Sequence, residues 1–159
     1  MEEPVVLMIP TGNSVREQMG DLIHQDLLAA GLNVVQEKYD FSTWITNARE
    51  GKFDLGLVGM SHTYDPDLSS YFSSGGATNM GFYKSEKMDE LLTKGKNEVD
   101  FESRKPIYDE LQEFFMEDQP VVPLYSEFDY KIQSKNLNGG VSEFWPNTTS
   151  NIHEWTFEN

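Results

Sequence analysis

The chain has 159 residues, and its 27 acidic and 12 basic side chains give a net charge of −15 with the three histidines neutral. This length is typical of one compact domain. A domain of this size buries a core large enough to fold without disulfides, and the chain has no cysteine to form them. A surface this acidic repels a phosphate backbone, so nucleic-acid binding is not expected. The longest apolar run, Val5 to Ile9, is far shorter than the roughly 20 residues that cross a bilayer.

Strands and helices alternate over the first 58 residues. The apolar run Val5 to Ile9 predicts a strand buried on both faces, and Ser14 with Glu17 has the spacing of a capping box that begins a helix. The expected elements are strands at 5–9, 32–39 and 53–58 and helices at 14–30 and 42–50. Such an order is typical of an α/β fold with an open mixed, largely parallel sheet flanked by helices.

Residues 61–76 break this pattern, because they are rich in serine, aspartate and glycine and show no sustained period. A loop longer than about 12–15 residues in a compact domain is usually functional or disordered, and the aromatic residues here argue against disorder. The loop follows the third strand, where open α/β sheets bind ligands. Tyr64 is therefore a candidate ligand contact, whereas Tyr71 and Phe72 are expected to pack the loop onto the sheet.

Two further helices and an irregular tail follow the loop. The helices are expected at 85–96 and 100–117, and Pro106 in the second should bend or restart that helix. Residues 121–135 are expected to be extended. The tail 136–159 is expected to be a loop with one short strand.

No catalytic or metal motif stands out. Asp65 and Asp67 would begin a calcium loop, but the glycine and glutamate that an EF-hand needs further along are absent. His24, expected to be solvated, His62 and His153 have no partner at metal-binding spacing. Neither a metal nor a cofactor is therefore expected, although a cation at Asp65 and Asp67 stays open. An α/β hydrolytic enzyme stays an alternative, because folding can bring two carboxylates together.

Six strings along the chain carry a resemblance to a known family. They are Gly51–Leu55, Tyr64–Phe72, Gly81–Ser85, Met88–Leu92, Arg104 with Ile107, Tyr108 and Glu110–Gln112, and Glu117–Pro120 with Val122–Tyr125. In this order they resemble extracellular solute-binding protein family 5, the peptide- and nickel-binding receptors of ABC importers. The similarity covers about Val5 to Gly140.

The resemblance implies a two-lobed protein of which this chain is one part. Residues 1–159 would form a single domain, the C-terminal ligand-binding lobe of a periplasmic-binding-protein type II fold, and the tail 136–159 either completes it or belongs with the missing N-terminal lobe. The implied function is binding peptides outside the membrane and delivering them to an ABC permease, without enzymatic activity. The implied location is the periplasm, or the extracellular face of the cytoplasmic membrane with a lipid anchor upstream of Met1.

The resemblance also suggests the ligand-binding residues. Met60 stands where family members usually carry a tryptophan, and the aspartate with which some peptide binders hold an amino terminus is missing before Tyr64. The string Tyr64 to Pro66 is similar to that of nickel-chelate binders, in which the tyrosine lines the pocket. The candidate ligand-binding residues are Met60, His62, Thr63, Tyr64 and Asp65. A nickel chelate or another small solute stays an alternative ligand, and a stand-alone interaction module an alternative class.

Overall fold

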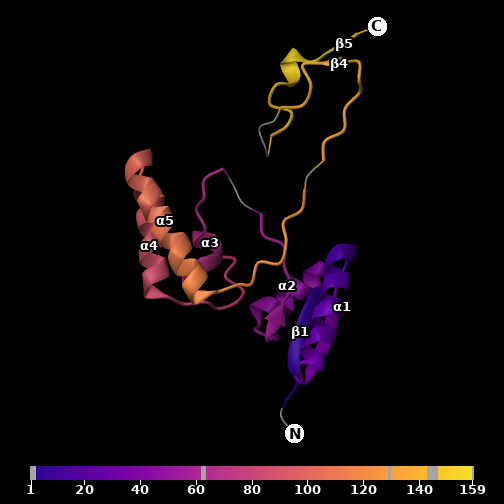
Figure 1. Cartoon of the computed structure of the whole chain (residues 1–159), viewed down its shortest axis with the longest axis vertical. Helices are drawn as coiled ribbons and strands as arrows, with labels where there is room; N and C mark the ends of the chain where they lie inside the picture. Colours follow the sequence, from indigo (N-terminus) through magenta and orange to yellow (C-terminus); the bar gives the residue numbers. More distant parts are fainter. Residues whose placement is uncertain (1–2, 62–63, 129, 143–146, 159) are drawn as a thin grey trace. The chain divides into compact units, whose positions relative to one another are not determined.

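The computed structural model describes residues 3–61, 64–128, 130–142 and 147–158 (Figure 1). The chain divides into two compact units, Met1–Pro120 and Val121–Asn159. The α-helices that the structure describes all belong to the first unit.

A three-stranded parallel sheet in the order β2-β1-β3 organises the first half of this unit. The central strand β1 (Val5–Pro10) pairs along its whole length with β2 (Val34–Tyr39). On its other side β1 pairs with β3 (Leu55–Gly56) over only two residues, so the third strand is shorter than the predicted 53–58. The crossovers contain α1 (Ser14–Ala29) and α2 (Phe41–Arg49). The predicted α/β fold with a parallel sheet is confirmed.

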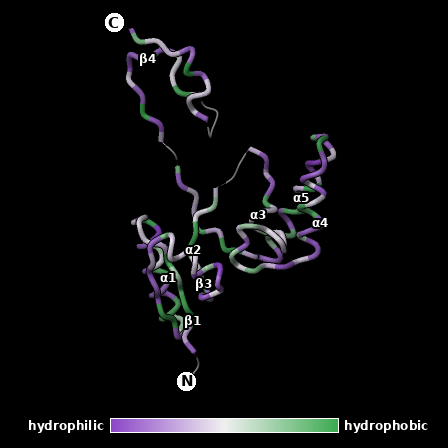
Figure 2. Tube along the Cα trace, turned by 180° about the vertical axis from the view of Figure 1, so that it is seen from behind, coloured by the Kyte–Doolittle hydropathy of each residue, from purple (hydrophilic) through white to green (hydrophobic). Residues whose placement is uncertain are grey.

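One face of β1 packs against α1. Leu7 and Ile9 are 2% and 0% exposed and form a cluster with Val34 and Leu57, against which side chains of α1 pack. A Cβ atom on Gly20 of α1 would lie only 2.1 Å from Cδ1 of Ile9, so the close approach of α1 to β1 depends on the missing side chain. The hydrophobic colour along β1 in Figure 2 marks the strand at the centre of this packing.

The opposite face of β1 packs against α2. Because side chains alternate along a strand, Met8 lies on the face opposite its neighbours. Met8, Trp44 and Ala48 form a second buried cluster, and Nε1 of Trp44 donates a hydrogen bond to the carbonyl oxygen of Met8 at 3.3 Å. The strand is therefore covered on both faces, as its uninterrupted apolar sequence predicts.

The start of α1 differs from the predicted capping box. Asn13 is the N-cap residue, and its side-chain oxygen accepts a hydrogen bond from the backbone N–H of Arg16 at 2.9 Å. Oε1 of Glu17 accepts one from the N–H of Gly12 at 2.9 Å. The prediction that Ser14 caps the helix is wrong, since Asn13 has the extended backbone of a cap and Ser14 is already helical.

His24 is another correction on α1. The histidine was expected to be solvated, but its side chain is half-buried between the helix and the sheet. Its Nε2 atom lies 3.2 Å from the carbonyl oxygen of Val34 at the start of β2. The hydrogen bond thus links the helix to the strand that follows it.

Helices α3 (Ser69–Phe72), α4 (Glu86–Asn97) and α5 (Phe101–Asp118) pack together in the second half of the first unit. Phe72 is 4% exposed and makes an edge-on contact with Phe115 of α5, with ring centroids 4.9 Å apart. The expectation that Phe72 packs onto the sheet is therefore wrong. α5 also continues through Pro106, contrary to the predicted restart, because a proline removes only one hydrogen bond of a long helix.

The second unit contains little regular structure. Residues 121–135 have no strand or helix among the positions that the structure describes. Two short antiparallel strands, β4 (Leu137–Asn138) and β5 (Thr156–Phe157), pair with each other, and the 3₁₀ helix η1 (Ile152–Glu154) lies between them in the sequence. The prediction of one short strand in the tail misses this pairing.

Candidate functional site

The carboxyl ends of β1 and β3 form the edge of the sheet at which the site is expected. The chain leaves β1 through α1 to reach β2, and then returns through α2 to reach β3 on the other side of β1. The connections on the two sides of β1 therefore cover opposite faces of the sheet. In open α/β sheets, the crevice at such a switch point is the usual ligand site. Here the corresponding edge of the sheet is formed by residues 11–13 after β1 and residues 57–60 after β3.

Arg16 lies at this edge of the sheet. A Cβ atom on Gly59 would lie 2.7 Å from Nη2 of Arg16, so the guanidinium of α1 reaches across to the backbone that follows β3. The structure describes all the lysines and arginines of the chain, and only Arg16 and Arg104 among them are half-buried. Arg104 forms an ion pair with Asp65, whereas no carboxylate in the described part of the chain lies within ion-pair distance of Arg16.

The loop after β3 is attached to α5 through Arg104. Nη2 of Arg104 lies 2.7 Å from Oδ1 of Asp65, and Nε of the same guanidinium donates to the carbonyl oxygen of Gly95 at 2.8 Å. The hydrogen bond from Arg104 lowers the pKa of the Asp65 carboxyl. One arginine thus connects the loop, α4 and α5.

Asp67 and Tyr71 fix the next part of the loop. Oδ1 of Asp67 accepts a hydrogen bond from the backbone N–H of Ser69 at 2.9 Å, and Oδ2 lies 3.1 Å from Nζ of Lys96. The hydrogen bonds from Ser69 and the charge of Lys96 lower the pKa of Asp67. The hydroxyl of Tyr71 donates to the carbonyl oxygen of Ser61 at 3.0 Å. Both aspartates of the Asp-Pro-Asp string therefore interact with cations of the protein itself.

The predicted ligand-binding residues lie on the surface where the structure describes them. Met60 is half-buried, Tyr64 is 56% exposed, and Asp65 is exposed next to its arginine partner. His62 and Thr63 lie outside the described residues. Arg16 was missed by the sequence analysis. The signal for it is an arginine in the first turn of a helix that follows a buried strand, in a chain with few basic residues.

Metal and membrane signatures can be stated for the described part of the chain. Within residues 3–61, 64–128, 130–142 and 147–158, no three acidic or histidine side chains gather in a group that could hold a metal ion. No helix in these ranges combines the length and the apolar character needed to cross a membrane.

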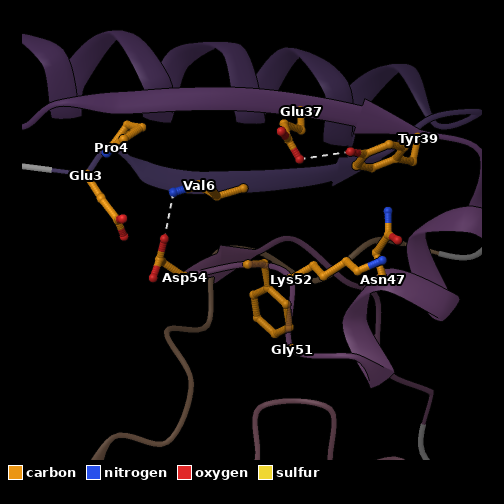
Figure 3. Close-up of a pocket in the computed structure, with 10 residues that line it drawn as sticks. Glu3, Pro4, Val6, Glu37, Tyr39, Asn47, Gly51, Lys52 and Asp54 are labelled. Atoms are coloured by element: carbon orange, nitrogen blue, oxygen red, sulfur yellow. Dashed lines mark hydrogen bonds between the residues drawn. The ribbon is translucent and has the colours of Figure 1, made fainter.

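A separate pocket of about 550 Å³ lies on the α2 face of the sheet (Figure 3). Two hydrogen bonds join residues that line it: the hydroxyl of Tyr39 donates to Oε2 of Glu37 at 2.9 Å, and Oδ2 of Asp54 accepts from the N–H of Val6 at 2.7 Å. The hydrogen bond to Glu37 raises the pKa of Tyr39. The residues that line this pocket include none of the predicted ligand contacts.

Sequence comparison with curated proteins finds peptide-binding relatives. The chain is 27% identical over 136 residues to di/tripeptide-binding protein 2 of Pseudomonas aeruginosa, covering 82% of this chain and 25% of that protein. It is 26% identical over 133 residues to the oligopeptide-binding protein AppA of Bacillus subtilis, covering 80% of this chain and 24% of AppA. The chain thus spans about a quarter of the length of these relatives. No protein-family model matches the chain.

Comparison with solved structures also finds proteins in complex with peptides. The structure of AppA from Bacillus subtilis in complex with a nonapeptide superposes with a TM-score of 0.72 and 22% identity, covering 98% of this chain and 32% of AppA. DppA from Helicobacter pylori in complex with the peptide STSA superposes with a TM-score of 0.66 and 28% identity, covering 76% of this chain and 25% of DppA.

Together these findings define the class of the chain. Its fold is that of the type II periplasmic binding proteins. The chain is a relative of the oligopeptide- and dipeptide-binding proteins of solute-binding family 5, as the six sequence strings predict. The relatives named above are binding proteins.

Proposed function

We propose that the chain is the C-terminal lobe of a two-lobed receptor that binds peptides outside the membrane and delivers them to an ABC permease. The observation that carries this proposal is the match, in both sequence and fold, to proteins solved with peptides bound. In support, Tyr64 in the segment after β3 is 56% exposed, and Met60 is half-buried. The role of the lobe is binding, not chemistry.

Ligand binding would work by closure of two lobes on the peptide. This lobe contributes the edge formed by the ends of β1 and β3, and the N-terminal lobe contributes the opposite wall. A ligand shifts the balance between open and closed forms only by binding the closed form better. The closed form would then dock on the permease, at the outer face of the cytoplasmic membrane or in the periplasm, with the lipid anchor in the preceding part of the protein.

The sequence after α5 supports a missing partner. Apolar side chains occur at alternate positions except at Ser126, and they are between 47% and 95% exposed: Val122, Leu124, Phe128, Tyr130 and Ile132. Alternation of this kind is typical of a strand with one buried face. In the described part of 121–135 no strand forms. We assign this apolar side to contact with the N-terminal lobe.

Chemical-shift mapping on the isotopically labelled chain tests the proposal. Titration with the tripeptide Ala-Ala-Ala is expected to move backbone amide signals of residues 11–16 and 57–67 and to leave those of the pocket in Figure 3 unchanged. Tyr64→Ala should weaken the effect. Phe82→Ala is the matched control, because Phe82 is 55% exposed and Tyr64 56%.

The outcome separates the alternatives. Shifts confined to other surfaces, or equal weakening by both substitutions, would contradict the proposed ligand edge. A nickel–histidine complex in a parallel titration tests the alternative of a metal-chelate receptor, which would give larger shifts than the tripeptide at the same residues.

A further inference from the structure

We propose that Arg104 is a positioning residue for the ligand-binding segment after β3, and that Asp65 anchors this segment instead of touching the ligand. The inference rests on the proposed binding function and gives Asp65, one of the predicted ligand contacts, a different role. Two ion pairs carry it, Asp65 with Arg104 of α5 and Asp67 with Lys96 of α4.

Two residues close to Tyr64 in the sequence are held by helices. Before it, the backbone carbonyl oxygen of Ser61 accepts a hydrogen bond from the hydroxyl of Tyr71 in α3 at 3.0 Å. After it, Oδ1 of Asp65 lies 2.7 Å from Nη2 of Arg104 in α5. Because the backbone of Tyr64 continues directly into Asp65, this ion pair restricts where Tyr64 can lie.

The guanidinium of Arg104 is held in place by its own helix and by α4. Nε donates to the carbonyl oxygen of Gly95 at 2.8 Å, and Nη2 donates to the hydroxyl of Tyr108 at 3.2 Å. The guanidinium also lies 5.1 Å from the centre of the Tyr108 ring. Tyr108 packs closely on α4, since a Cβ on Gly95 would lie 2.8 Å from its Cε2 atom. The helices therefore present a fixed cation to which the exposed Asp65 of the loop is tied.

The loop folds around the two carboxylates. Oδ1 of Asp65 also accepts a hydrogen bond from the backbone N–H of Asp67 at 3.1 Å. Oδ1 of Asp67 accepts one from the N–H of Ser69 at 2.9 Å, and its Oδ2 lies 3.1 Å from Nζ of Lys96. Each carboxylate thus has a cation of the protein as its partner and needs no ligand group to balance its charge.

The exposure of these ion pairs favours a local role. Asp65 and Lys96 are exposed, and ion pairs at the surface contribute little to the stability of a whole domain. Their expected effect is to order the loop before the ligand arrives. A loop that is ordered in advance binds more tightly, because binding then costs less conformational freedom.

Calorimetric titration of Ala-Ala-Ala into the two-lobed protein, this chain extended by the preceding lobe, tests the inference. Arg104→Gln should weaken binding about two- to tenfold, the factor that corresponds to ordering one further side chain. Arg104→Lys keeps a cation near Asp65 and should restore part of the affinity. Lys105→Gln is the matched control, because it removes the same charge from the next position of α5, where Lys105 pairs with Asp109 of the same helix. It should leave the affinity unchanged.

A double-mutant cycle separates an anchor from a ligand contact. Asp65→Ala should weaken binding about as much as Arg104→Gln, and the double substitution should weaken it no further, because both changes remove the same ion pair. Hydrogen exchange of residues 64–69, followed by mass spectrometry without ligand, should become faster in these three variants and stay unchanged in Lys105→Gln. A role confined to folding would instead lower the midpoint of urea unfolding and leave the affinity of the folded protein unchanged.

The results distinguish failure of this inference from failure of the proposed function. If the natural two-lobed protein binds Ala-Ala-Ala and Arg104→Gln binds it equally well, or if exchange of residues 64–69 does not change, the positioning role is wrong and peptide binding stands. Additive effects of Asp65→Ala and Arg104→Gln would place Asp65 in contact with the ligand and overturn the inference as well. If the natural two-lobed protein does not bind the tripeptide, the proposed function fails, and the positioning role fails with it.

Discussion

Gly20→Ala tests the close packing of α1 on β1. A Cβ at position 20 would lie 2.1 Å from Cδ1 and 2.9 Å from Cγ1 of Ile9, and 3.1 Å from Cδ1 of Leu57. Ile9 is 0% exposed, so its side chain is enclosed by the rest of the protein and cannot turn out into solvent. Two effects oppose each other: alanine stabilises a helix by about 0.8–1 kcal/mol relative to glycine, and overpacking costs about 1–3 kcal/mol.

The clash is expected to outweigh the gain in helix propensity, with a net loss of up to about 2 kcal/mol in the free energy of unfolding. Urea unfolding followed by circular dichroism at 222 nm measures it, because the described α-helices all belong to the first unit. Ile9→Val removes the Cδ1 atom that makes the closest contact. On that background Gly20→Ala should be nearly neutral, so that the two substitutions together cost less than their sum.

A stabilisation by Gly20→Ala of about 1 kcal/mol on the natural background, the value expected from helix propensity alone, would refute this account of the α1–β1 contact. Additive effects of the two substitutions would refute it as well, because atoms that do not touch do not couple.

Three further predictions concern the core, a helix cap and the loop. Trp44→Ala should lower the free energy of unfolding by about 3–5 kcal/mol, as for other buried aromatic residues, and Trp44→Phe should lower it by less. An unchanged midpoint of urea unfolding would contradict the burial of Trp44 against Met8 and Ala48. Hydrogen bonds from the Ser42 and Thr43 side chains and backbone lower the pKa of Asp40 below its usual 3.8, so its stabilisation is complete above that pH and is lost as the pH falls through the lower folded-state pKa. Asp40→Asn should flatten this acidic part of the stability curve, and an unchanged slope would count against it. Arg104→Gln should raise the pKa of Asp65 and speed amide exchange at residues 65–67, both measurable by NMR; a constant Asp65 titration would show that the ion pair does not form in solution.

Much of the fold follows from local sequence pattern. The run from Val5 to Ile9 is apolar at every position, and the structure accordingly buries β1 between α1 and α2. The limits of β3 do not follow from pattern, because they depend on where the strand meets β1: only Leu55 and Gly56 pair with it. Packing between distant segments decides such limits.

In the candidate site, too, some features follow from local sequence and others only from the packing of distant segments. Position along the chain suffices to predict a surface loop after the third strand, and Tyr64 is exposed there. Sequence spacing does not bring Arg16 to Gly59, since 43 positions separate them and only the parallel pairing of β1 with β3 makes them neighbours. Phe72 is a similar case, because its partner Phe115 belongs to a helix whose packing the local pattern does not specify.

The central claim is that this chain supplies one half of a peptide site. Calorimetric titration of one tripeptide into this chain alone, and into the protein extended by the preceding lobe, tests it most directly. The account predicts millimolar or undetectable affinity for the chain alone and affinity at least about a thousandfold higher when both lobes are present, because closure adds the contacts of the second wall. Submicromolar binding by the chain alone, or equal affinities of the two proteins, would contradict it.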